Sequence, residues 1–126
     1  MKQSEHNEKF CPVAQSLGVI GDSWSLLILR NSFFGTKRFD EFQSELGLTR
    51  HVLADRLKKM VSFDIMKKVP INPQATRFEY QLTQKGKELR PVLMTLATWG
   101  NKWLSEEGQQ NMYYVHEACG HISRPT

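Results

Sequence analysis

The most informative segment of this chain spans residues 46–63 and reads LGLTRHVLADRLKKMVSF. Leu53, Leu57 and Met60, with Val61 beside them, recur at the spacing of one helical face. This spacing predicts an α-helix whose apolar stripe packs into a hydrophobic core. Its polar face would then remain free to contact a partner.

A helix-turn-helix is predicted from the residues around the start of this helix. Phe39, Phe42 and Leu46 mark a short preceding helix, and Gly47 supplies the tight turn that leaves it. Thr49 stands where its hydroxyl can accept a hydrogen bond from the free N–H groups of the first turn. Helix, glycine-containing turn and capped helix follow one another in the order of a helix-turn-helix.

The polar face of the second helix is short, basic and partly built of small residues, like the end of a recognition helix that enters the major groove. Arg50 and His51, in the first turn, are predicted to point into the groove and to donate to guanine N7 or O6. Thr49 and Lys58 are predicted to contact backbone phosphates. Ala54 completes this face. The alternative interpretation is an ordinary solvated helix face.

Two extended segments follow, at residues 65–71 and 78–82, with alternating apolar side chains. Residues 72–76, NPQAT, predict a hairpin loop between them, and residues 36–38 predict a short extended segment that adds one rung. A β-hairpin directly after a recognition helix is a wing. Its basic residues can also be ordinary outward residues that discourage strand pairing. Candidate contacts to phosphates or the minor groove are Lys67, Lys68, Gln74, Thr76 and Arg77.

Two helices are predicted before this unit. Proline is favoured at the first helical position, so Pro12 places Cys11 at the N-cap of a helix that ends near Gly21. Asp22 caps a second helix, which Gly35 ends. This second helix is apolar over most of its circumference and is therefore expected in the middle of the domain.

A last helical segment begins at Thr83. Pro91 lies too deep for one uninterrupted helix and predicts a kink or two consecutive helices. The apolar stripe of this segment includes Trp99 and Trp103 and exceeds what a small winged-helix core can cover. A partner surface is implied.

The composition is that of a soluble globular domain. The 126 residues suffice for one domain with a core, and 40% hydrophobic and 24% charged residues are ordinary values. A net charge of +4 favours a polyanionic partner only weakly. The sequence shows no membrane span or signal peptide, and Cys11 and Cys119 do not make a disulfide framework. We expect a cytoplasmic protein whose domain, residues 10–107, lies between polar tails at 1–9 and 108–126.

Five co-linear segments resemble the HxlR-type winged-helix transcription regulators, relatives of the MarR group. They are CPVAQSLGVIGDSWSLLILR, FDEFQSELG, LTRHVLADRLKKM, RFEYQLTQKGKELRPVL and LATWG. The resemblance covers roughly residues 10–104. The chain departs from the family pattern at residues 62–65, where SFDI stands in place of a glycine-containing turn.

The resemblance implies a homodimer that forms through the first and last helices. The corresponding dimerisation residues are Val13, Leu17, Leu96, Trp99 and Trp103. It also implies that Cys11 responds to oxidants or electrophiles, because several relatives use a cysteine before proline in this way. A thiol at a helix N-terminus faces free N–H groups and the positive end of the helix dipole, which favour the reactive thiolate. The alternative is a small inert residue packed in the dimer interface.

Two further groups of residues are less informative. Arg56 lies beside the buried stripe and is predicted to form an internal ion pair with Asp40 or Glu41. Three potential ligands near the end of the chain are too few for a closed structural zinc site, so neither a metal nor another cofactor is predicted. These ligands are His116, Cys119 and His121.

The sequence therefore predicts a mainly α winged helix-turn-helix with one small hairpin, which binds a pseudo-palindromic operator in duplex DNA as a homodimer and regulates transcription. The alternative is a winged-helix module that binds another protein. An enzyme is not predicted, because the chain lacks a phosphate-binding glycine loop, a zinc-protease helix and a nucleophile elbow. A Cys–His pair through Cys11 is not positioned by anything in the sequence.

Overall fold

The computed structural model describes residues 11–74 and 76–105. The predicted tails at 1–9 and 108–126, and with them His116, Cys119 and His121, lie outside the described residues. Within the described part the chain forms helices and one hairpin, in agreement with the predicted fold class. The elements are α2 (Pro12–Ile20), α3 (Ser23–Phe34), α4 (Phe39–Leu46), α5 (Arg50–Ser62), β1 (Met66–Pro70), β2 (Phe78–Leu82), α6 (Gln84–Lys87) and α7 (Arg90–Trp103).

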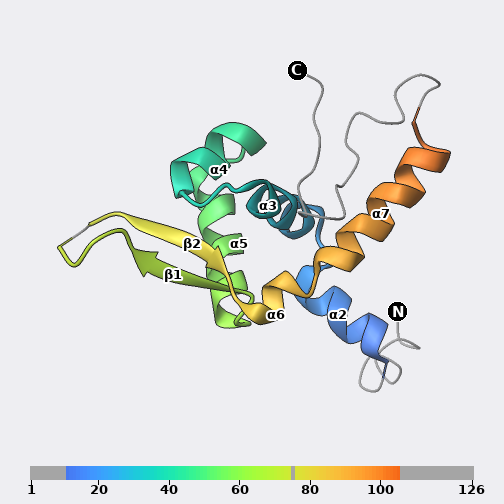
Figure 1. Cartoon of the computed structure of the whole chain (residues 1–126), viewed down its shortest axis with the longest axis horizontal. Coiled ribbons are helices and arrows are strands. Elements are labelled where there is room, and N and C mark those ends of the chain that lie inside the picture. Colours follow the sequence, from blue (N-terminus) through green and yellow to red (C-terminus); the bar gives the residue numbers. More distant parts are fainter. Residues whose placement is uncertain (1–10, 75, 106–126) are drawn as a thin grey trace.

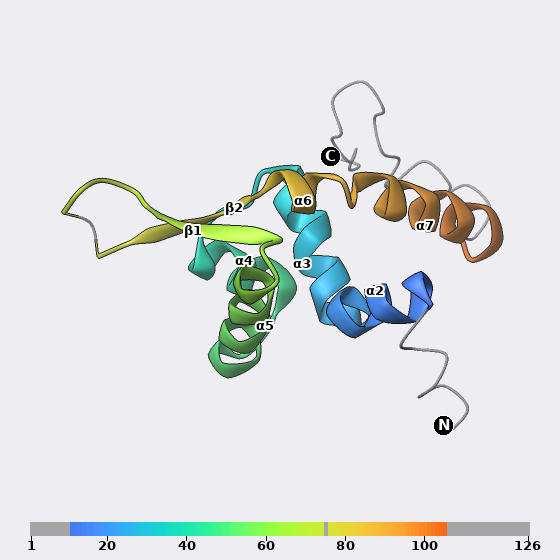
Figure 2. The same cartoon turned by 90° about the horizontal axis from the view of Figure 1, so that it is seen from below.

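The hairpin and the two terminal helices lie on opposite sides of a central group of helices. In both views α3 lies between α2 and α7 on one side and the pair α4 and α5 on the other, and the hairpin projects away from α7 (Figures 1 and 2). This separation leaves the hairpin and α5 available to one partner and the terminal helices available to another.

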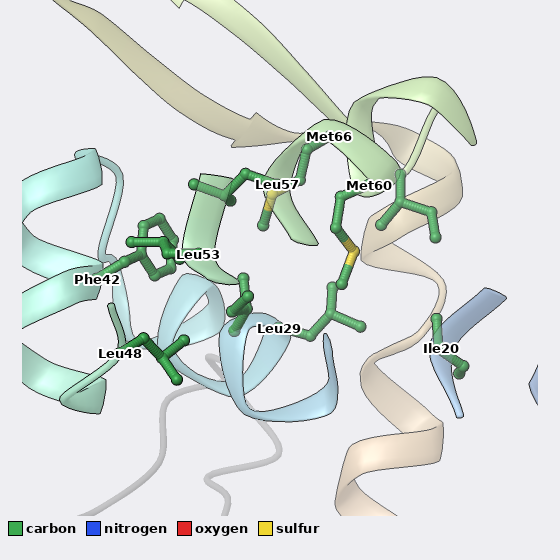
Figure 3. Packing of buried hydrophobic residues seen from close by; sticks show 10 residues of the cluster. Ile20, Leu29, Phe42, Leu48, Leu53, Leu57, Met60 and Met66 are labelled. Atoms are coloured by element: carbon green, nitrogen blue, oxygen red, sulfur yellow. The ribbon is translucent and has the colours of Figure 1, made fainter. Parts of the chain in front are cut away.

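The core forms around the apolar stripe of α5. Leu53, Leu57 and Met60 are fully buried, as their spacing predicts, and they pack with residues of α3, α4 and the start of β1 (Figure 3). Burying each such side chain contributes roughly 1.5–3 kcal/mol. Val61 is 36% exposed and does not belong to the stripe. It follows Met60 by one residue, and the turn of the helix between the two places its side chain at the edge of the buried face. The partners in the core are Ile20, Ile28, Leu29, Phe42, Leu48, Ile65 and Met66.

Local side-chain caps fix where the helices begin. The Asp22 carboxylate accepts from the Ser25 backbone N–H at 2.9 Å, and the Thr49 hydroxyl accepts from Val52 N–H at 3.2 Å. The Thr83 hydroxyl caps α6 in the same way. The predicted caps at Asp22 and Thr49 are therefore confirmed, and the last helical segment begins after Thr83 as predicted.

The predicted helix ends are also confirmed. Gly35 and Gly47 end α3 and α4 with φ of 113° and 68°, a left-handed conformation that favours glycine. Pro91 lies in the first turn of α7, so the last segment is two consecutive helices and not one kinked helix. Cys11 is the N-cap residue of α2, but its side chain makes no capping hydrogen bond.

The turn between α5 and β1 is built without glycine. Asp64 has φ of 61°, and it is the non-glycine residue that takes a left-handed conformation in the described chain. It stands within residues 62–65, where the sequence departs from the family pattern. Aspartate tolerates this conformation better than most residues.

The hairpin is a two-stranded antiparallel sheet that pairs Met66 with Leu82 and Lys68 with Tyr80. The backbone N–H of Tyr80 donates to the carbonyl oxygen of Lys37 at 2.7 Å. This single bond ties residues 36–38 to β2, but they form no strand, so the predicted one-rung strand is absent. This bond holds the start of α4 against the wing.

A polar cluster with two buried donors and an exposed carboxylate joins the end of α3 to α4. The Asn31 amide and the Thr36 hydroxyl both donate to Glu45 Oε1, at 2.9 and 2.7 Å. Asn31 and Thr36 are buried, so the shared carboxylate satisfies donors that would otherwise be costly to remove from water. The cluster fixes the angle at which α4 leaves α3.

Within residues 11–74 and 76–105, no single helix is long and apolar enough to cross a membrane. Only α2 and α3 taken together meet that criterion by length and composition, and they are bent by 78°.

Candidate nucleic-acid interface

The N-terminal half of α5 presents one exposed polar face. Thr49, Arg50, His51, Ala54 and Lys58 are all exposed, while the stripe on the opposite side of the helix fills the core. The helix that contributes three buried side chains to the core, Leu53, Leu57 and Met60, thus also supplies a free surface. The structure therefore presents on one surface the residues that the sequence predicts to contact DNA from this helix.

Arg50 does not extend straight outward from this face. Its guanidinium lies over the ring of Phe39, 4.8 Å from the ring centroid. A cation at this position over an aromatic ring is stabilised by about 0.5–1 kcal/mol at an exposed site. The contact turns Arg50 toward the start of α4 and toward the hairpin.

A depression of about 440 Å³ lies between the start of α4, the start of α5 and the hairpin. It brings together Arg50, Lys68, Thr76 and Arg77, all of which the sequence predicts to bind DNA. It also includes Arg38, which the sequence did not single out. The only available signal was its position in the basic extended segment directly before α4.

Not every predicted residue belongs to this depression. His51, Ala54 and Lys58 do not line it and stay on the open face of α5. Gln74 lies in the hairpin loop, exposed, and its backbone N–H donates to Asn72 Oδ1 at 3.1 Å. The candidate residues therefore form a depression, an open helix face and a loop tip.

Lys68 and Tyr80, which both line the depression, are affected by their surroundings. The ammonium of Lys68 lies 4.7 Å from the centroid of the Phe78 ring. Burial raises the pKa of Tyr80 above its ordinary value, so its phenol stays protonated near neutral pH and can donate a hydrogen bond.

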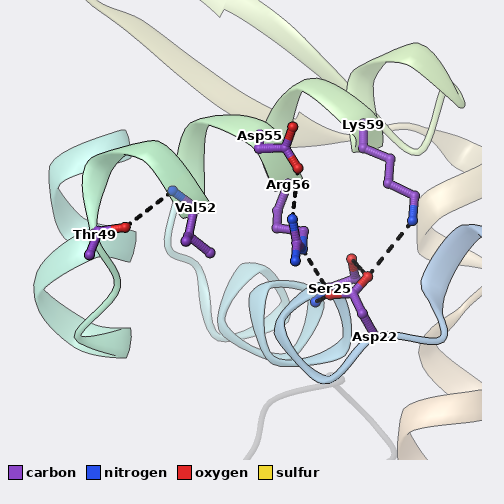
Figure 4. Close-up of polar contacts among 7 residues, drawn as sticks. All are labelled: Asp22, Ser25, Thr49, Val52, Asp55, Arg56 and Lys59. Atoms are coloured by element: carbon purple, nitrogen blue, oxygen red, sulfur yellow. Dashed lines mark hydrogen bonds and ion pairs between the residues drawn. The ribbon is translucent and has the colours of Figure 1, made fainter.

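The opposite side of α5 is tied to the start of α3 by charged groups (Figure 4). Arg56 Nε donates to Asp22 Oδ1 at 3.1 Å, and Lys59 Nζ lies 3.8 Å from Asp22 Oδ2. Arg56 Nη1 also donates to Asp55 at 2.7 Å. The predicted partners of Arg56 on α4 are therefore wrong, because Arg56 faces the N-terminus of α3.

The Asp22 carboxylate is held in its charged form. Partial burial alone would raise its pKa, but hydrogen bonds from the Ser25 hydroxyl and backbone N–H, together with Arg56, outweigh that effect. The pKa of Asp22 consequently lies below its ordinary value. This residue connects the end of α2, the cap of α3 and the middle of α5.

A large apolar surface is left on the terminal helices. Leu17 of α2 is 57% exposed and Trp103 of α7 is 63% exposed. No residue of α7 is buried, and an apolar groove runs along it past Pro91, Leu96 and Trp99. The five side chains predicted to form a dimer are all exposed here, and they are Val13, Leu17, Leu96, Trp99 and Trp103.

Cys11 is half-buried and directly precedes α2, the helix that carries Val13 and Leu17. Among the described residues, no group of three or more His, Cys, Asp or Glu side chains is placed to hold a metal ion.

Comparison with known proteins assigns a family to this arrangement of exposed helix, wing and terminal helices. The family described as HxlR-like helix-turn-helix matches residues 19–108. The chain belongs to the HxlR-like helix-turn-helix family. The matched segment contains the helix-turn-helix, the wing and α7, and it begins after Cys11.

Similar proteins described as transcription regulators match over most of the chain. An HTH-type transcriptional regulator of Mycobacterium tuberculosis is 34% identical over 113 residues, which are 90% of this chain and 72% of that protein. The crystal structure of PA1607, described as a transcription factor, is 38% identical with a TM-score of 0.80, covering 97% of this chain and 85% of the other. The relatives are transcriptional regulators, not enzymes.

A further similar structure is that of a redox regulator. The redox regulator HypR in its oxidised form is 28% identical, with a TM-score of 0.69, over 76% of this chain and all of the HypR chain. The HxlR-like fold of this chain is thus shared with a protein described as responding to redox state.

Proposed function

We propose that this HxlR-like protein is a homodimeric regulator that binds a pseudo-palindromic operator in duplex DNA. The observation that supports DNA binding best is the exposed face of α5 beside a depression lined by four cationic side chains. A helix of this kind enters the major groove, and the adjacent wing reaches the backbone or the minor groove. His51 and Ala54 would face base edges, while Thr49 and Lys58 would contact phosphates.

Dimerisation is proposed through α2 and α7. Exposed tryptophans and leucines on two neighbouring terminal helices are unfavourable in water, and burying them against a second copy removes this surface. A twofold dimer would place the two α5 helices about one turn of DNA apart, roughly 34 Å. We take residues 10–107 as the unit that binds and dimerises, in the cytoplasm where the DNA is.

Sensing of oxidants or electrophiles through Cys11 is the third part of the proposal. Support comes from its place at the N-terminus of a proposed dimer helix and from the fold shared with the redox regulator HypR. Modification of a thiol at the interface would favour a dimer arrangement that fits the operator less well.

Selection of bound fragments from a pool of random duplexes tests DNA binding. We expect enrichment of an inverted repeat and an affinity that falls steeply with salt, because phosphate contacts release counterions. His51→Ala should reduce discrimination between the enriched duplex and a mixed-sequence duplex. No enrichment, together with binding of a protein partner that is insensitive to salt, would instead favour the winged-helix interaction module.

A further inference from the structure

The depression between α4, α5 and the hairpin concentrates positive charge. Arg38, Arg50, Lys68 and Arg77 line it, and Asp40 is the one acidic residue among the lining residues, so four cations minus one carboxylate leave a charge of +3. None of the four cations forms an ion pair with a described carboxylate. Like charges gathered in one concave site repel one another and attract an anion.

Two of these cations contact an aromatic ring in the free protein. Arg50 lies over Phe39 and Lys68 lies over Phe78, with distances to the ring centroids of 4.8 and 4.7 Å. A long side chain that is already ordered loses less conformational entropy when it binds. Each ring contact contributes about 0.5–1 kcal/mol and biases these two cations toward the depression before an anion binds.

The position of the depression indicates which anion it binds. It lies between the start of α5, which would enter the major groove, and the hairpin, which would reach the next minor groove. The sugar-phosphate strand that separates these grooves must pass between the two elements. The depression measures about 440 Å³. This is more than ten times the roughly 30 Å³ that one water molecule occupies, so the depression is larger than a single water or small ion needs.

We infer that this depression is a clamp for backbone phosphate on the strand between the two grooves, with Arg38 as a ligand and with Arg50 binding phosphate instead of a base. The inference rests on the proposed DNA binding and assigns the phosphate-binding part of that site. Arginine suits this role because its planar fork of donors matches phosphate oxygens. The contact reads no sequence, so it should strengthen binding to every duplex alike.

Salt dependence on a mixed-sequence duplex measures the clamp directly. We compare the wild-type chain with Arg38→Ala and Arg50→Ala, and use Lys37→Ala as the matched control. Lys37 is the exposed, positively charged neighbour of Arg38, and it does not line the depression. Each clamp variant should lower the slope of log affinity against log salt by about 0.9, which reduces the wild-type advantage about 3.5-fold between 50 and 200 mM salt.

A second experiment identifies which phosphate of the DNA the depression binds. A single methylphosphonate, which removes one backbone charge, is moved along the duplex enriched by the wild-type protein. One position should weaken wild-type binding and leave Arg38→Ala unaffected, while Arg38→Lys should restore part of the slope. Circular dichroism shows whether each variant remains folded.

The outcomes separate the clamp from the proposed function. If the wild-type protein binds an enriched duplex but Arg38→Ala and Arg50→Ala retain the salt slope of Lys37→Ala, the clamp is wrong and DNA binding stands. If Arg50→Ala relaxes sequence preference with an unchanged slope, Arg50 reads a base and the assignment is overturned. A wild-type protein that binds no duplex overturns the proposed function and the clamp together.

Discussion

Replacing Asp22 should weaken the whole domain, because one carboxylate serves two elements. It accepts from the Ser25 backbone N–H at 2.9 Å and from the Ser25 hydroxyl at 2.6 Å, which caps α3. It also accepts from Arg56 Nε at 3.1 Å on α5. Loss of an N-cap side chain costs about 1 kcal/mol, and a hydrogen-bonded ion pair of intermediate exposure adds about 1 kcal/mol.

Two substitutions separate these contributions. Asp22→Ala removes the cap and the charge, so the free energy of unfolding should fall by about 2 kcal/mol. Asparagine caps helices as well as aspartate does, so Asp22→Asn should cost only the charge, about 1 kcal/mol. Asp55→Asn is the control, since Asp55 pairs with the same Arg56 but its side chain is 61% exposed. Its effect should stay within about 0.5 kcal/mol.

The effect of Asp22→Asn should shrink in acid. The folded-state pKa of Asp22 is lowered, so its stabilising contribution is present above the unfolded-state pKa, near 4, and is lost as pH falls through the lower folded-state value. Urea unfolding at matched protein concentration, at neutral pH and near pH ~3, gives both comparisons. An Asp22→Asn deficit that does not shrink on acidification would show that the charge of Asp22 is not its cause.

Three further substitutions test other parts of the structure. Asp64→Val should lower the free energy of unfolding by about 1–2 kcal/mol relative to Asp64→Asn in urea titrations, since a β-branched residue is disfavoured at positive φ. Trp99→Glu should shift sedimentation from dimer to monomer without loss of helical circular dichroism, because Trp99 is exposed in the single chain; an unchanged dimer would place the interface elsewhere. Cys11→Ser should keep the protein on its enriched duplex in the presence of diamide, and equal release of variant and wild type would rule out sensing through this thiol.

The element boundaries could be predicted from sequence because their causes are local. The caps at Asp22 and Thr49 join residues three apart, and the ends at Gly35 and Gly47 need only a backbone conformation that glycine adopts easily. Pro91 likewise acts within one turn. Interactions of this range depend on residues that the chain already holds close together.

Contacts between elements could not be predicted in the same way. Arg56 and Asp22 are 34 residues apart, and Asn31 and Glu45 are 14 apart. Helical periodicity gives the side of α5 on which Arg56 lies, but not which neighbouring helix that side faces. Glu41 was a reasonable partner by charge, yet its carboxylate accepts from the backbone N–H of Arg38 at 3.3 Å.

Arg50 in the candidate site also combines a position that the sequence predicts with a side-chain contact that it does not. The sequence places it correctly in the first turn of the exposed helix, but a long side chain there can reach a base, a phosphate or a neighbouring ring. In the structure the guanidinium lies over the ring of Phe39, 4.8 Å from its centroid, an orientation that helical periodicity does not indicate. If the proposed DNA binding holds, base recognition would fall to the shorter side chains that remain on the open face of α5, while the cations beside the wing would supply affinity that does not depend on sequence.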